Sequence, residues 1–270
     1  MISLTFIGHA TWLIEWPGGR VLTDPMLSSR IAGIWPRLNP PALGAEELPP
    51  VDTVLISHPH LDHMDIPTLR RLNRNATLAV PRETAGLAKR LGYRETAALD
   101  DWNSFEPAPG LKITAVPAIH VGIRVVGLGA SARGAIGYVI EAAGRSIYFA
   151  GDTAYGPHFT QIRERTNPDV AILPIGAYSP WFFMKYFHMS PRAALRAFGD
   201  LGAEWCIPCH FGTFALSLEP ARQPLQLFKR EAARHDLTDR TVIVDRGQTA
   251  VFNNKKPQIK NYEKKPARIV

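Results

Sequence analysis

Asp52 to His63 reads DTVLISHPHLDH, a strand-like apolar run that leads directly into four potential metal ligands. The ligands are the imidazoles of His58, His60 and His63 and the carboxylate of Asp62. A strand end that turns into a helix can direct the first two of these side chains at one point and the last two at a neighbouring point. Two metal ions about 3.5 to 4 Å apart can be held in this way. The pattern favours a metal site over the alternative of a solvated turn rich in histidine.

Three further candidate ligands stand where other strand-like runs end. His120 ends LKITAVPAIH, Asp152 ends SIYFAGD and His210 ends EWCIPCH. Each is weak evidence alone, because a histidine at a strand end is more often a hydrogen-bonded surface or core residue. Together with the first group they complete seven His and Asp side chains. We expect two divalent ions, with zinc favoured and iron or manganese as alternatives.

Strand-like and helical patterns interleave along the chain, which predicts an α/β fold of the α+β type in one large domain. The strand-like runs occupy 4–7, 11–16, 20–24, 52–58, 77–81, 111–120, 136–142, 146–152, 169–175, 204–210 and 241–245. Amphipathic helical patterns fit 66–73, 84–91, 191–201 and 220–235. The Pro-rich stretch 35–50 is interpreted as a long surface loop, because the piece before it is too short to bury a core of its own. The Gly-rich segment 122–137 is interpreted as a turn region.

Most of the positive charge lies in the C-terminal segment. The formal net charge is +7, and 253–270 contribute +5 of it through five Lys, one Arg and one Glu. We expect a domain over 1–252 and a basic, flexible tail over 253–270, which either aids solubility or contacts an anionic membrane. The nearly neutral remainder gives no nucleic-acid signal. No apolar run could span a membrane and the N-terminus lacks a signal-peptide pattern, so a cytoplasmic location is expected.

Cys206 and Cys209 precede His210 in a Cys-x-x-Cys-His pattern, which also attaches haem covalently. We reject haem attachment, because no export signal accompanies the motif and His210 belongs to the metal set. A strand places residues three apart on opposite faces, which also argues against a disulfide or a two-thiol metal site. The two cysteines are predicted to be small buried apolar side chains.

The order of the ligands, HxHxDH followed by a His, a Gly-Asp-Thr and a further His, resembles the metallo-β-lactamase superfamily. Six segments are similar to the branch that contains N-acylphosphatidylethanolamine-hydrolysing phospholipase D: FIGHATW, LTDPMLSSR, ELPPVDTVLISHPHLDHMD, YFAGDTAY, LPIGAYSPWFFMKYFHMSP and HFGTFAL. The resemblance runs from about Phe6 to Phe252. Two departures concern the identity of the substrate. Val121 stands where the family commonly has Trp, and Ser179-Pro180-Trp181 replace an acidic-Pro-Arg triplet.

The resemblance implies a four-layer αββα sandwich, in which two packed mixed sheets are flanked by helices and the metals lie at one edge. It also implies that the first metal is held by His58, His60 and His120, the second by Asp62, His63 and His210, and that Asp152 bridges them. His9 and Asp24 are expected beneath the metals, where a carboxylate can accept the free N–H of a ligand histidine. The alternatives are that Asp24 caps the turn into Pro25 and that His9 is a packed core histidine.

These residues predict hydrolysis by a hydroxide that bridges the two metals. Asp62 would orient the water or accept its proton, and His188 would contact the substrate oxyanion or protonate the leaving oxygen. The aromatic run Trp181 to Phe187 is interpreted as an apolar wall beside the metals, with core packing as its alternative. The favoured substrate is a phosphodiester of phospholipid type, and the second is a carboxylic ester or lactone. A nuclease, an iron redox protein and a non-catalytic binding module are weaker alternatives.

Overall fold

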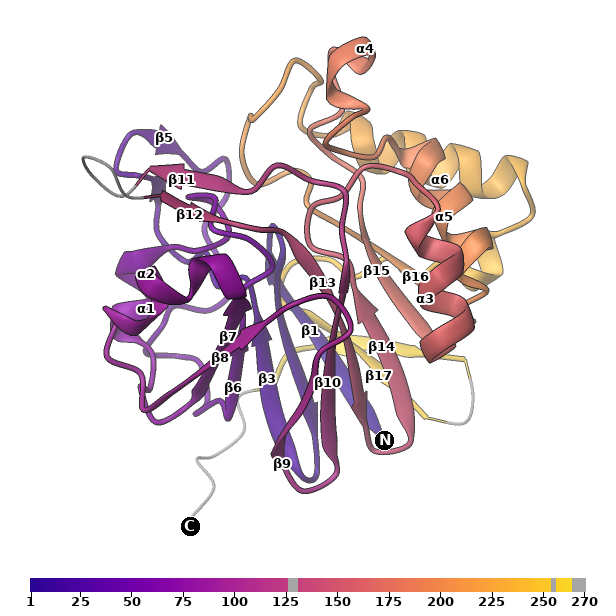
Figure 1. The fold of residues 1–270 in the computed structure, drawn as a ribbon. Helices are drawn as coiled ribbons and strands as arrows, with labels where there is room; N and C mark the ends of the chain where they lie inside the picture. The colour runs from indigo at the N-terminus through magenta and orange to yellow at the C-terminus, as the bar shows by residue number, and fades with distance from the viewer. Residues whose placement is uncertain (126–130, 254–255, 264–270) are drawn as a thin grey trace.

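An eight-stranded mixed sheet forms one half of the molecule (Figure 1). The computed structural model describes residues 1–125, 131–253 and 256–263. Along the sheet, the strands follow the order β18 (Gln258–Asn261), β17 (Gln248–Phe252), β1 (Ile2–Gly8), β2 (Thr11–Trp16), β3 (Gly19–Thr23), β6 (Thr53–Leu55), β7 (Thr77–Pro81) and β8 (Glu95–Leu99). The pairs from β3 to β8 are parallel, and the pairs from β18 to β3 are antiparallel.

A six-stranded mixed sheet forms the other half. Its order is β16 (Trp205–Cys209), β15 (Val170–Pro174), β14 (Arg145–Phe149), β13 (Ile136–Ala142), β10 (Leu111–Pro117) and β9 (Ser104–Ala108). Two short hairpins lie outside both sheets, and they consist of β4 (Arg30–Ile31) with β5 (Trp35–Pro36) and of β11 (Ile123–Val125) with β12 (Ser131–Arg133). The predicted turn region 122–137 contains the second hairpin, and its residues 126–130 lie outside the described residues.

Helices cover the outer face of each sheet (Figure 1). The first sheet carries α1 (Ile66–Arg71), η1 (Arg82–Thr84) and α2 (Ala85–Lys89), and the second carries α3 (His158–Thr166), α5 (Pro191–Leu201), α6 (Gln223–Arg234) and η2 (Thr238–Arg240). One apolar core lies between the two sheets. A second lies between the six-stranded sheet and its helices, and a third lies between the eight-stranded sheet and its helices. The structure therefore confirms the four-layer αββα sandwich.

Strand β2 shows why so many strands are apolar throughout. Trp12 and Ile14 pack into the core between the sheets, whereas Leu13 packs into the core beneath α1 and α2. Successive side chains of a strand point to opposite faces. A strand covered on both faces must therefore be apolar at consecutive positions.

Helix α5 is predicted from the sequence to the residue, because strong local signals mark both ends. Ser190 caps the start by accepting a hydrogen bond from the backbone N–H of Ala193, and Pro191 occupies the first turn. Gly202 ends the helix with φ of +64°, a left-handed conformation that costs glycine little. The apolar face between these ends packs on the second sheet.

The predicted strand at 241–245 is wrong. Val242 and Val244 are buried, which explains the alternating pattern, but the segment makes only one isolated bridge, between Thr241 and Cys206. Among the strands of the two sheets, β8, β9, β17 and β18 were not predicted. Strands β8, β9 and β18 stand at the edges of their sheets, where one row of backbone groups is unpaired and the side chains are more polar.

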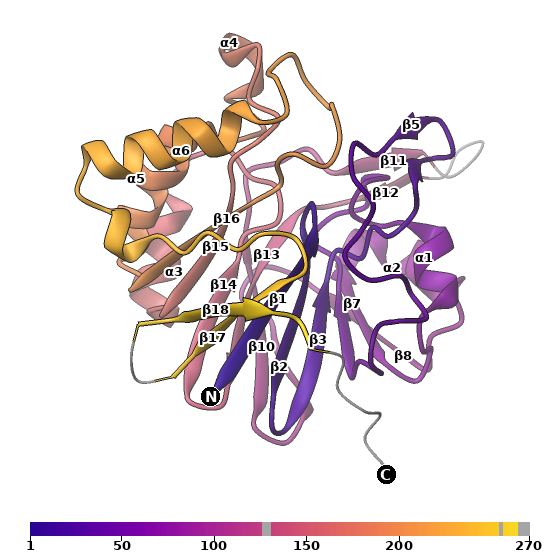
Figure 2. The same cartoon turned by 180° about the vertical axis from the view of Figure 1, so that it is seen from behind.

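The first sheet continues beyond the predicted domain boundary at Phe252. Strand β18 pairs with β17 from Gln258 to Asn261, and Figure 2 shows the two extending the sheet beyond β1. The structure differs here from the predicted flexible tail, because β17 offers an open edge to which a polar segment can bind through its backbone. Residues 254–255 and 264–270 lie outside the described residues. The expected membrane contact of this basic segment stays a prediction. None of the described helices is long and apolar enough to cross a bilayer.

Candidate metal centre

The candidate ligands gather at one edge of the sandwich, where strands from both sheets end. His9 follows β1 and Asp24 follows β3, while His210 follows β16 directly. The backbone N–H of His210 donates to the carbonyl of His9 at 2.9 Å, which joins the two sheets at this edge. His9, Asp24 and His210 have φ values of +59°, +33° and +56°. Non-glycine residues rarely adopt this region, and such strain concentrates at functional sites.

Three histidines form one group of potential ligands. Nε2 of His58 lies 3.0 Å from Nδ1 of His60, and Nε2 of His120 lies 3.2 Å from the same His60 nitrogen. One nitrogen from each ring falls within a sphere that could hold a single ion. This is the trio that the resemblance assigns to the first metal.

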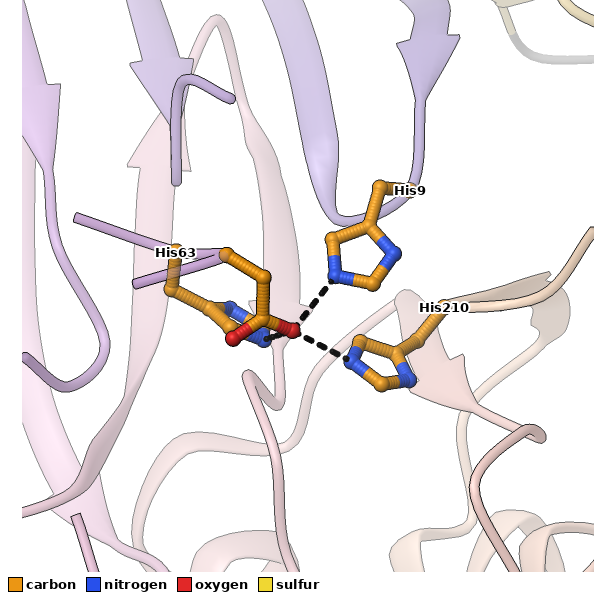
Figure 3. A group of neighbouring side chains, drawn as sticks. His9, His63 and His210 are labelled. Atoms are coloured by element: carbon orange, nitrogen blue, oxygen red, sulfur yellow. Dashed lines mark hydrogen bonds and ion pairs between the residues drawn. The ribbon is translucent and has the colours of Figure 1, made fainter. Parts of the chain in front are cut away.

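A second group surrounds the carboxylate of Asp62. Figure 3 shows the imidazoles of His9, His63 and His210 pointing toward one carboxylate. Nε2 of His9 lies 2.9 Å from Oδ2 of Asp62, and Nε2 of His63 and of His210 lie 3.5 and 3.6 Å from it. Three members of this group were assigned to the second metal. His9 was expected beneath the metals, and the structure brings its ring into the same group, where it is buried and hydrogen-bonded to Asp62. A role in the metal centre stays a prediction.

Asp152 lies between the two groups. Its Oδ2 is 3.9 Å from Nε2 of His58 and 3.3 Å from Nε2 of His63, and its Oδ1 is 3.3 Å from Nε2 of His210. Gly151 precedes it with φ of +60°, and a Cβ there would come within 2.4 Å of the Ser57 side chain. The glycine thus lets the turn that carries Asp152 pass close to the turn that carries His58. The position is the one expected of a bridging ligand, and the assignment stays a prediction.

Asp24 orients two of the candidate ligands. A carboxylate can only accept, so Nδ1 of His63, 2.7 Å from Oδ2 of Asp24, carries the proton. The hydroxyl of Ser57 donates to the same Asp24 oxygen at 2.5 Å and accepts from Nδ1 of His58 at 2.9 Å. Both rings are thereby held with Nε2 free for a metal. Asp24 therefore does more than cap a turn. Ser57, whose part the sequence analysis missed, immediately precedes the HxHxDH motif.

The segment with His188 contacts the centre through its backbone and its ring. Nδ1 of His120 donates to the carbonyl of Phe187 at 2.9 Å, and Nδ1 of His188 lies 3.7 Å from Oδ2 of Asp152. Trp181 and Phe182 are 59% and 72% exposed. The alternative of core packing is therefore wrong for α4 (Trp181–Met184), which stands at the upper edge in Figure 1.

Burial and charge set the protonation of these groups. Burial lowers the pKa of His58 well below its usual value, and the neighbouring His63 and His120 lower it further. Burial alone would raise the pKa of Asp152, but His210, His63 and His188 hold it well below its usual range. The pKa of His63 shifts in the opposite direction to that of His58. Burial would lower its pKa, but Asp152, Asp62 and Asp24 raise it well above the usual value. Three carboxylates around one imidazole make this the place where a cation is stabilised.

The residues fit divalent metal ions. Nε2 of His63, both ring nitrogens of His210 and Oδ1 of Asp152 are buried and have no hydrogen-bond partner among the described residues. An unsatisfied buried polar atom costs about 1 to 3 kcal/mol, so these atoms call for a further partner. Imidazole nitrogens and carboxylate oxygens are the donors that borderline first-row ions accept. Metal ions would satisfy these atoms and offset the charge of the carboxylates.

The fold is a two-sheet αββα sandwich, and a candidate metal centre of His and Asp side chains lies at one of its edges. The chain belongs to the metallo-β-lactamase superfamily: the sequence model of the Beta-lactamase superfamily domain matches residues 19–211.

Curated relatives agree with this family. A UPF0173 metal-dependent hydrolase of Methanopyrus kandleri is 33% identical over 92% of this chain and 99% of its own length. An N-acyl-phosphatidylethanolamine-hydrolyzing phospholipase D of Caenorhabditis elegans is 33% identical over 90% of this chain and 74% of its own. An uncharacterised protein of Mycobacterium tuberculosis is 35% identical over 83% of this chain, but the match spans only 62% of that protein.

Among solved structures, Igni18, a metallo hydrolase of Ignicoccus hospitalis, is similar to this chain with a TM-score of 0.70 and 25% identity. The similarity covers 94% of this chain and 99% of the archaeal one.

The cysteines before His210 take no part in the site. Cys206 packs beneath α5 and α6, whereas Cys209 packs between the sheets, and both thiols are free and buried. The predicted opposite faces and burial are confirmed. We expect the Cys206→Ala/Cys209→Ala variant to keep its metal content and its activity within about threefold, with a modest loss of thermal stability from the small cavities. Elemental analysis and a melting curve test this, and a loss of metal would contradict it.

Asp24 offers a test of ligand orientation. Asp24→Asn replaces an acceptor-only carboxylate by an amide whose NH₂ group would face a donor, so His63 and Ser57 would no longer be held. We expect the metal affinity to fall by about 10- to 100-fold. Competition with a chromophoric chelator measures it. Asp52→Asn is the matched control, because Asp52 accepts a backbone N–H from Arg20 at 2.7 Å and contacts no candidate ligand. Equal metal affinities of the two variants would contradict this role of Asp24.

Proposed function

We propose that the protein is a phosphodiesterase of the phospholipase D type, acting on phospholipid-like substrates. The observation that carries the proposal is the likeness to the nematode N-acyl-phosphatidylethanolamine-hydrolyzing phospholipase D over 90% of this chain. Such a substrate joins an apolar portion to a charged headgroup through a phosphodiester, and the reaction releases the headgroup alcohol.

A cavity of 740 Å³ beside His188 supports this substrate class. Trp181, Leu195 and Leu237 contribute apolar wall, while Lys185 and Arg196 contribute positive charge. A mixed apolar and cationic lining suits a molecule that is both lipid-like and anionic. The exposed aromatic side chains of α4 continue the apolar surface outward from this cavity.

The metal ions supply the central chemistry when bound, because they lower the pKa of water and polarise a phosphoryl oxygen. Asp62 contributes an ionised carboxylate at the same place. Burial would raise its pKa, but His63, His210 and His9 hold it well below the usual range. An ionised carboxylate can orient an attacking water and accept its proton.

His188 contributes a neutral imidazole. Burial lowers its pKa to about 3, against the opposing effect of Asp152. A neutral ring rarely protonates a leaving oxygen near pH 7, but its N–H can donate to a phosphoryl oxygen as negative charge develops there. Of the two roles expected for His188, contact with the oxyanion is therefore favoured.

Activity profiling tests the proposed function. The zinc-loaded protein is assayed against bis(p-nitrophenyl) phosphate, an N-acyl phosphatidylethanolamine in mixed micelles and a long-chain lactone. We expect cleavage of both phosphodiesters, and release of the N-acylated headgroup alcohol from the lipid. Hydrolysis of the lactone with neither phosphodiester cleaved would overturn the proposal in favour of an esterase or lactonase. The Asp152→Ala variant, prepared identically, controls for contaminating hydrolases.

A further inference from the structure

Two cavities are bordered by residues of the candidate metal centre or by its neighbour His188. The first, of 740 Å³, is bordered by His188. The second, of 440 Å³, is bordered by His60 and Asp62. Within the part of the chain that the structure describes, no residue lines both, so they are separate spaces.

A row of imidazoles connects the two cavities. The ring centroids of His60 and His120 are 5.0 Å apart, and those of His120 and His188 are also 5.0 Å apart. A substrate whose scissile group lies over this row can extend one arm past His60 and the other past His188. The cavities are then the binding sites of its two arms.

The cavity beside His188 is suited to an anion. Lys185, Arg192 and Arg196 line it, and none of the described residues that line it is acidic. The amine of Lys185 lies 4.5 Å from the Trp181 ring, and the guanidinium of Arg196 lies 4.3 Å from the Tyr155 ring. These aromatic contacts hold the two cations beside the cavity, and neither cation forms an ion pair with a carboxylate among the described residues. The nearby Asp200 accepts a hydrogen bond from the Tyr155 hydroxyl. Arg192 differs, because its Nε lies 3.8 Å from Glu231.

The lining of the cavity beside His60 is more uniformly apolar. Its walls are the side chains of Ile31, Trp35, Leu61, Ile123 and Leu216. Among the described residues that line it, Arg124 is the one cation, and it donates to the carbonyl oxygen of Met64 at 2.6 Å. An alkyl or acyl group would cover these apolar side chains and remove their surface from water.

Resting on the proposed function, we propose that the substrate is an asymmetric diester that lies across the centre in one orientation. Its apolar arm occupies the cavity of Trp35 and Leu216. In the preferred substrate, the other arm carries a second negative charge, a carboxylate or a phosphate, which binds between Lys185 and Arg196. An N-acyl phosphatidylethanolamine lacks this charge and would be cleaved less efficiently. The two cavities thus determine both the substrate class and the direction in which it is bound.

Equilibrium binding of two probes tests the proposal without requiring turnover. Octylphosphonate and 5-carboxypentylphosphonate share a metal-binding group, but one carries an apolar arm and the other an anionic arm. Their dissociation constants are measured by calorimetry on the zinc-loaded protein. We expect Lys185→Gln/Arg196→Gln to raise the dissociation constant of the carboxylated probe by about tenfold. The dissociation constant of octylphosphonate should stay within about twofold of the wild-type value. We expect Leu216→Ser to raise the dissociation constant of octylphosphonate by about fivefold and to leave that of the carboxylated probe nearly unchanged.

Matched variants control for charge and polarity. Arg234→Gln removes an exposed cation of α6 that lines neither cavity, and Leu218→Ser changes a side chain that is 77% exposed two residues beyond Leu216. Both should bind the two probes as the wild type does. Trp35→Ala repeats the apolar test should Leu216→Ser fold poorly.

A crossed pattern of losses supports the two-arm arrangement, and equal losses for both probes or none would overturn it. The outcome is independent of the proposed function. If the protein shows the crossed pattern but cleaves no phosphodiester, the two binding sites are supported and the assignment as a phosphodiesterase is wrong. If the protein cleaves phosphodiesters but does not show the crossed pattern, the proposed function stands and the two-arm arrangement is wrong.

Discussion

Replacing Asp152 with Ala is expected to remove metal and hydrolytic activity together. Its two carboxylate oxygens lie 3.3 Å from Nε2 of His63 and 3.3 Å from Nε2 of His210, so one side chain serves both parts of the centre. Without it, His58, His63 and His210 each lose one carboxylate within 3.9 Å, and neither ion would keep the set of ligands predicted for it. A metal site contributes several kcal/mol to transition-state stabilisation, so we expect activity to fall by about 10³-fold or more.

Elemental analysis of protein purified without chelator checks this result. The wild type should contain close to two divalent ions per chain, and Asp152→Ala clearly fewer. Asp101→Ala removes an exposed carboxylate that is not among the candidate ligands and should match the wild type. An Asp152→Ala protein that retains both ions would show that Asp152 is not a ligand. A wild-type stoichiometry near zero after metal supplementation would refute the metal centre itself.

His188→Ala is expected to lower turnover by about 10²-fold while leaving metal content and melting temperature near those of the wild type. The ring lies at the entrance of the larger cavity, and its Nδ1 is 3.7 Å from Asp152. The seven other side chains already provide ligands for two ions, so His188 remains available to contact the substrate. The loss should appear in kcat more than in KM, because a donor to developing charge acts mainly in the transition state.

The pH profile separates the two roles of His188. Burial lowers its pKa to about 3 from an ordinary value of 6.5, so the ring stays neutral at every pH well above 3. As a neutral hydrogen-bond donor, it should give a rate ratio of wild type to His188→Ala that is constant from about pH 5 to 8. Substrates with good and with poor leaving groups should show the same loss of turnover in His188→Ala. A ratio that grows as the pH falls, with greater loss for poor leaving groups, would instead identify His188 as a general acid. Loss of metal from the His188→Ala variant would instead identify His188 as a metal ligand.

Several features of this protein follow from local sequence alone. His58, His60, Asp62 and His63 are brought together by a few residues of chain, so their spacing predicts a cluster before any fold is known. Helix α5 carries both of its end signals, Ser190 and Gly202, within its own sequence. The doubly covered strands are apolar at consecutive positions for the same local reason. The edge strands β8, β9 and β18 lack that signal, because they need less apolar side chain to be stable.

Other features depend on contacts between residues that are far apart in sequence. His9 lies beside Asp62 only because β1 and β6 end at the same edge, and Asp24 meets Ser57 and His63 for the same reason. Val242 and Val244 alternate like a strand, but no partner continues a ladder beyond one bridge with β16, and pairing is decided by the neighbouring chain. The larger cavity is lined by residues between Tyr155 and Leu237, part of α5 among them, whereas the smaller one brings Leu216 beside residues between Ile31 and Arg124. Sequence periodicity reports which face of an element is buried, whereas the position of one element against another is determined by packing over the whole fold.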